Sequence, residues 1–122
     1  MHDIKLPAGE ANNGVFADPA LWRAWCWCLF QAADGDRLDV IAVGKGSVQV
    51  PVTHGQFACQ RGTTAAALAV PDSTARNLME RLGKAGRITW EVSVDKQYRI
   101  ITIVSAKSYI RVKPKPKTSI IA

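Results

Sequence analysis

Several side chains between residues 73 and 87 can hydrogen-bond to nucleic-acid bases. Arginine can donate a pair of hydrogen bonds to guanine O6 and N7, and asparagine can pair in the same way with adenine. A helix over residues 73–85 would expose these groups together, so base reading is the chemistry that we expect of them. The candidate base-reading residues are Ser73, Thr74, Arg76, Asn77 and Arg81, and Lys84 and Arg87 are expected to contact phosphate. An ordinary solvated helix face is the alternative interpretation.

The apolar residues of this stretch have a helical period. Ala75, Leu78, Met79 and Leu82 are three and four residues apart and form one apolar face. A shorter helix is predicted over residues 63–69, with a tight break before the second helix and a glycine after it. Two helices joined by so short a turn cross at a steep angle, which is the arrangement of a helix-turn-helix.

A strand pair is predicted after the second helix. Apolar and polar residues alternate over 88–94, and residues 98–104 return with Ile101 and Ile103 expected to face inward. Lys96 and Arg99 are assigned to the tip of this hairpin, where they would contact phosphate or the minor groove; a plain hairpin with a charged tip is the alternative. Together these elements predict an α+β fold, a winged helix-turn-helix with a three-helix core and a small antiparallel β-sheet.

The first helix of this fold is expected near the N-terminus. Asp18 before Pro19 is an N-cap followed by proline at the first helical position, which predicts a helix over residues 19–33. Its three tryptophans cannot all point to one side. We expect Trp25 in the core, and Trp22 or Trp27 at a surface that meets a second copy of the chain or a replication or transcription protein.

The remaining segments complete the domain organisation. Two β-type runs over 38–43 and 47–52 predict a hairpin, and residues 53–57 are expected to lead into the helix-turn-helix. The predicted parts are a flexible N-terminal arm (1–14), a winged-helix domain (15–110) and a basic Pro/Lys tail (111–122). In this tail, Lys113, Lys115 and Lys117 would add electrostatic affinity for DNA, or the tail would be a linker.

Composition narrows the possible partners. The 16 Lys+Arg residues exceed the 10 Asp+Glu residues, and the net charge of +6 favours a polyanion. Three cysteines without a secretory signal are typical of a reducing compartment, so we expect a cytoplasmic protein. The apolar runs are too short to cross a bilayer, so no membrane partner is expected. No residues group as a catalytic or metal-binding set, so we expect neither an enzyme nor a cofactor.

Residues 15–109 resemble the winged-helix DNA-binding domains of phage- and prophage-encoded replication initiator (replisome organiser) proteins. The segments that carry this resemblance are the tryptophan-rich helix over 25–33, Gly55-Gln56, the helical stretches 64–70 and 73–78, residues 82–89, and the strand with its following tyrosine over 101–109. The chain differs in having Thr64 at an apolar position and Pro71 where a capping serine is usual, which moves the expected cap to Asp72 or Ser73. The C-terminal domain that such initiators often use to recruit helicase-loading machinery has no counterpart here.

The resemblance implies sequence-specific binding of double-stranded DNA, at a replication origin of a phage or another mobile element. Two other functions are compatible with the same residues. One is a small transcription regulator, and the other is a protein-interaction module that uses the tryptophan-rich helix.

Overall fold

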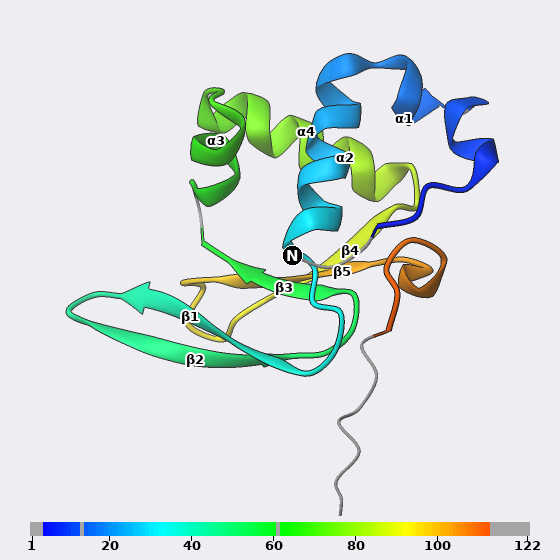
Figure 1. Cartoon of the computed structure of the whole chain (residues 1–122). Helices are drawn as coiled ribbons and strands as arrows, with labels where there is room; N and C mark the ends of the chain where they lie inside the picture. Colours follow the sequence, from blue (N-terminus) through cyan, green and yellow to red (C-terminus); the bar gives the residue numbers. More distant parts are fainter. Residues whose placement is uncertain (1–3, 13, 61, 113–122) are drawn as a thin grey trace, which may run out of the picture.

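The computed structural model describes residues 4–12, 14–60 and 62–112, and these residues form an α+β fold. The helices are η1 (Ala8–Asn12), α1 (Gly14–Ala17), α2 (Pro19–Gln31), α3 (Thr63–Leu68), α4 (Asp72–Lys84) and η2 (Ala106–Ser108). The strands are β1 (Arg37–Val43), β2 (Gly46–Val52), β3 (Gln56–Cys59), β4 (Ile88–Val92) and β5 (Arg99–Ile103). Figure 1 shows three layers, with α2, α3 and α4 on one side of β3, β4 and β5 and the β1–β2 hairpin on the other.

The central layer is a three-stranded antiparallel sheet with the strand order β3-β5-β4. Because successive side chains of a strand point to opposite faces, Phe57 and Ile101 face the helices whereas Ala58 and Ile100 face the hairpin. The sheet therefore separates two apolar clusters, a larger one beneath the helices and a smaller one beneath the hairpin.

The predicted strand pair is confirmed near the core and differs from expectation at its far end. Ile101 and Ile103 are buried, as expected. Strand β4, however, ends at Val92, and the side chains of Val92 and Val94 are 58% and 104% exposed. The apolar alternation over 88–94 thus continues beyond the part of the hairpin that α4 covers.

Helix α2 begins as the sequence predicted. The Asp18 carboxylate accepts hydrogen bonds from the backbone N–H groups of Ala20 and Leu21, and Pro19 occupies the first turn. Trp25 is fully buried, which confirms its assignment to the core. The helix ends at Gln31, slightly earlier than expected, because the backbone N–H of Ala33 donates to the Gln56 carbonyl oxygen of β3.

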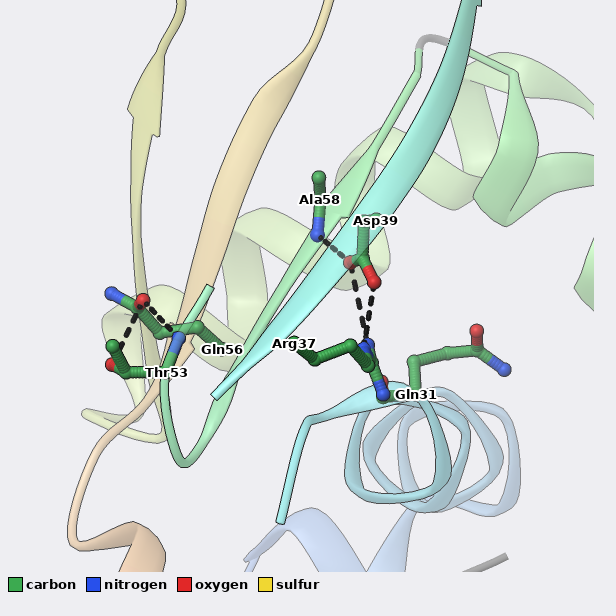
Figure 2. Close-up of polar contacts among 6 residues, drawn as sticks. All are labelled: Gln31, Arg37, Asp39, Thr53, Gln56 and Ala58. Atoms are coloured by element: carbon green, nitrogen blue, oxygen red, sulfur yellow. Dashed lines mark hydrogen bonds and ion pairs between the residues drawn. The ribbon is translucent and has the colours of Figure 1, made fainter. Parts of the chain in front are cut away.

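The predicted β1–β2 hairpin is confirmed, and side chains fix it against strand β3. Asp39 accepts a hydrogen bond from the backbone N–H of Ala58 at 2.9 Å and forms a salt bridge with Arg37 at 2.7 Å (Figure 2). Arg37 also donates to the Gln31 carbonyl oxygen, so it connects the hairpin to the end of α2. Residues 53–57 do more than lead into a helix, since they begin the edge strand β3.

The described part of the N-terminal arm is ordered against the domain, contrary to the expectation of a loose segment. Ile4 forms a β-bridge with Ile110, and the backbone N–H of Lys5 donates to the Tyr109 carbonyl oxygen at 2.7 Å. Helix η1 then buries Glu10, which is 6% exposed. Local sequence patterns do not reveal this packing, because the partners of the N-terminal segment are about a hundred residues away along the chain.

Helices α3 and α4 occupy the predicted positions. Ala75, Leu78, Met79 and Leu82 are all buried, which confirms the apolar face of α4. The expected cap at Asp72 or Ser73 is wrong. Pro71 is the N-cap residue, and its side chain forms no capping hydrogen bond with α4.

Candidate nucleic-acid interface

The first half of α4 presents an exposed polar surface. Ser73, Thr74, Arg76 and Asn77 are exposed, and within the described residues their side chains form no hydrogen bond or salt bridge. The burial of Ala75, Leu78 and Met79 turns these polar groups outward. Hydroxyl, guanidinium and amide groups are therefore available together on one rigid element.

Arg81 differs from the other candidate base-reading residues because it is held by a carboxylate. Its Nη2 atom lies 2.7 Å from Asp18 Oδ2, at the N-terminus of α2. The hydrogen bond from Arg81, with that from the Leu21 N–H, holds the pKa of Asp18 below its usual value. Arg81 thus links α4 to α2, and base reading by this residue would require it to leave Asp18.

Arg87, predicted to contact phosphate, is also engaged inside the molecule. Its Nη1 atom lies 2.6 Å from Glu10 Oε1 and 2.7 Å from the Tyr109 hydroxyl, and its guanidinium lies over the Trp25 ring, 5.6 Å from the centroid. Burial and the hydrogen bond to Glu10 raise the pKa of Tyr109. Arg87 therefore joins the N-terminal segment, the C-terminal segment and the core.

The sequence could not have identified the carboxylate partners of these two arginines. Glu10 is 77 residues from Arg87, in a segment without periodicity, and Asp18 is already accounted for as an N-cap. Lys84, by contrast, is exposed and forms no salt bridge with a described residue. It remains the cation at the C-terminal end of α4 that is available to a ligand.

The hairpin between β4 and β5 places its two candidate cations differently. Lys96 is exposed in the turn, where Ser93 Oγ accepts the N–H of Gln97 and donates to Asp95. The hydrogen bond from Ser93 also holds the pKa of Asp95 below its usual value. Lys96 is thus at the tip, as predicted.

Arg99 is not at this tip. It is the first residue of β5, between Cys59 of β3 and Val92 of β4, and its side chain is on the helix-facing side of the sheet. Its guanidinium lies over the Trp90 ring, 5.9 Å from the centroid. The reason is that β5 begins at Arg99, so this residue belongs to the sheet rather than to the turn.

The tryptophan-rich helix is less open than expected. Trp22 and Trp27 are half-buried, and each forms an edge-to-face contact, Trp22 with Phe16 at 5.2 Å and Trp27 with Phe57 at 5.5 Å. The more exposed aromatic side chains here are Phe16 and Phe30, at 46% and 49%. The predicted tail contacts through Lys113, Lys115 and Lys117 lie outside the described residues.

Within the described residues, no group of histidine, cysteine and carboxylate side chains is arranged to hold a metal ion. Cys26, Cys28 and Cys59 are free thiols, and burial raises the pKa of Cys28. None of the helices in residues 4–12, 14–60 and 62–112 has both the length and the apolar character of a membrane span.

In comparisons with known proteins, no protein-family model, curated protein or solved structure matches the chain.

Proposed function

We propose that the chain is a winged-helix variant that binds double-stranded DNA through the exposed face of α4. The observation that carries this proposal is that the polar side chains of α4 differ in whether a carboxylate already binds them. Arg81 is paired with a carboxylate, whereas Asn77, Thr74 and Lys84 are exposed without such a partner in the described part of the chain. Base reading requires hydrogen-bonding side chains that are not already engaged within the protein, and these residues meet that requirement.

The order of the elements supports the proposal. Helix α2, strand β3, helices α3 and α4, and the β4–β5 hairpin follow one another along the chain, and the strand order is β3-β5-β4. This succession is compatible with a winged helix in which the β1–β2 hairpin is an insertion between the first helix and the first strand. The net charge of +6 favours approach to a polyanion.

The biological process follows only from the resemblance to replication initiators. We place the protein at a replication origin on that ground, with transcription regulation as the alternative. The same DNA-binding surface would serve both.

The proposal predicts different roles for Asn77 and Lys84. A cognate duplex would first be selected from a random-sequence pool, and the affinities of the variants for it and for a scrambled duplex would be measured by fluorescence anisotropy. Asn77→Ala should weaken binding of the cognate duplex by about 1–3 kcal/mol and leave the scrambled duplex nearly unaffected, because a bidentate amide–adenine contact is lost. Lys84→Ala should weaken both duplexes equally, because phosphate contacts carry no sequence information.

Two outcomes would contradict this assignment. If the selection enriches no sequence, and the protein binds no duplex at low salt, then α4 does not read DNA. If Asn77→Ala weakens the cognate and the scrambled duplex to the same extent, Asn77 contacts only the backbone. Lys45→Ala is the matched control, because it removes an exposed charge of the β1–β2 turn, outside α4.

A further inference from the structure

A small cavity lies beside the proposed reading helix. It is lined by residues just after β3, in α3 and α4, and at the start of β5, and its volume is about 100 Å³. The polar residues around it are Gln60, Thr64, Asp72, Arg76 and Arg99. One water requires roughly 10–15 Å³ on this scale, so the cavity has room for a group of several heavy atoms.

Two arginines that have no carboxylate partner among the described residues line this cavity. The salt bridges of the described residues join Arg37, Arg81 and Arg87 to aspartate or glutamate, and neither Arg76 nor Arg99 takes part in one. Asp72 lines the same cavity, so its lining includes two cationic residues and one anionic residue. The lining of the cavity is therefore cationic on balance, whereas Arg37, Arg81 and Arg87 are each neutralised by a carboxylate.

The position of Arg99 is fixed by the packing around it. Its guanidinium lies on the Trp90 ring, and Trp90 in turn packs against Gly83 of α4. A Cβ atom added at Gly83 would lie only 3.0 Å from the Trp90 ring, so the glycine makes room for the indole. The cation is thus held in place before any ligand arrives, which lowers the entropy that binding would cost.

We propose that this cavity binds one phosphate group, held jointly by Arg76 and Arg99. The planar donors of arginine match the oxygens of a phosphate, and two such side chains around a small cavity are suited to a single tetrahedral anion. In the complex with DNA this anion is a phosphodiester next to the bases that α4 reads, and this part rests on the proposed function. Arg76 then contacts the backbone rather than a base edge, unlike the expectation from the sequence.

The first test uses the protein without DNA. Inorganic phosphate would be titrated into the ¹⁵N-labelled full chain at constant ionic strength, with chloride as the balancing anion. The amide signals of Gly62 and Asp72 and the Nε signal of Arg99 should shift and saturate. These shifts should vanish in Arg99→Gln and in Arg76→Gln, and they should persist in Lys45→Gln, which removes an exposed cation of the β1–β2 turn, outside the cavity. Shifts that never saturate, or that survive in both arginine variants, would overturn the proposal.

The second test asks whether the two arginines share one phosphate of DNA. Each phosphate contact contributes about −0.9 to the slope of log affinity against log salt concentration. Arg76→Gln and Arg99→Gln should each flatten this slope by up to about 0.9, and the double variant should flatten it by no more than about 0.9 in total. Both variants should weaken cognate and scrambled duplexes equally. A double variant that flattens the slope by about 1.8 would show two separate phosphates and would refute the shared cavity.

The two tests fail in different ways. Saturable phosphate binding without any DNA binding would retain the anion cavity and reject the proposed function. DNA binding with an unchanged salt slope in both variants would retain the function and reject the cavity.

Discussion

Replacing Arg87 with methionine should destabilise the fold much more than the loss of a typical surface charge would. Arg87 forms a salt bridge with Glu10 at 2.6 Å and donates a hydrogen bond to the Tyr109 hydroxyl oxygen at 2.7 Å. The side chains of the ion pair are only 17% and 7% exposed. Methionine would keep much of the apolar contact with Trp25 and would remove the charge and its hydrogen bonds.

The magnitude follows from the carboxylate that remains. Removing one partner of a buried ion pair costs about 3–5 kcal/mol, chiefly because the other charge stays buried without its counterion. Arg87 retains some contact with solvent, so we expect the lower end, about 3 kcal/mol. Since small domains are stable by only about 5–15 kcal/mol, the variant should be folded but markedly weakened.

Urea unfolding followed by tryptophan fluorescence would measure this change, and a second substitution tests its cause. Arg87→Met combined with Glu10→Leu should be more stable than Arg87→Met alone, because the double variant no longer buries a carboxylate that lacks its arginine. Arg81→Met is the matched control, since its salt bridge with Asp18 is largely exposed and should contribute little. A loss below about 1 kcal/mol for Arg87→Met would refute the structural role and return Arg87 to the set of possible phosphate contacts.

Two further predictions concern packing and can be checked by the same unfolding measurements. Trp25→Ala should lower the free energy of unfolding by about 3–5 kcal/mol because the indole is fully buried, and Trp22→Ala, at a half-buried position, should lower it less. Equal losses of stability would show that the buried face of α2 is misassigned. Gly55→Ala should lower the free energy of unfolding far more than Gly44→Ala. Both glycines have positive φ, but a Cβ at Gly55 would lie 2.4 Å from the Ala106 Cβ, whereas one at Gly44 meets no atom within 4 Å. Similar losses of stability at the two sites would mean that backbone conformation alone decides the effect.

Local patterns were sufficient for most of the secondary structure. The three-and-four spacing of apolar residues located both faces of α4, and the Asp18-Pro19 pair located the start of α2. The turn over 44–46 between two β-type runs located the β1–β2 hairpin. These features depend on hydrogen bonds and side-chain directions within a few residues, so a linear sequence contains them.

The layers could not be predicted in the same way. The position of the β1–β2 hairpin behind the sheet depends on the Asp39–Ala58 hydrogen bond and on a separate apolar cluster around Ile41 and Val52. The exposure of Val92 depends on how far α4 extends over β4, which the alternation along the strand does not reveal.

The availability of each cation was likewise decided by tertiary structure. The sequence by itself determined that α4 carries a basic polar face, because burying Ala75, Leu78 and Met79 forces the other side chains outward. Only the folded chain brought Glu10 and Asp18 to Arg87 and Arg81. It also placed Arg76 and Arg99 around one cavity, where neither forms a salt bridge with a described residue. The physical reason is distance along the chain: a helix period is set by neighbouring residues, whereas an ion pair between segments 77 residues apart exists only where packing of the core brings them together.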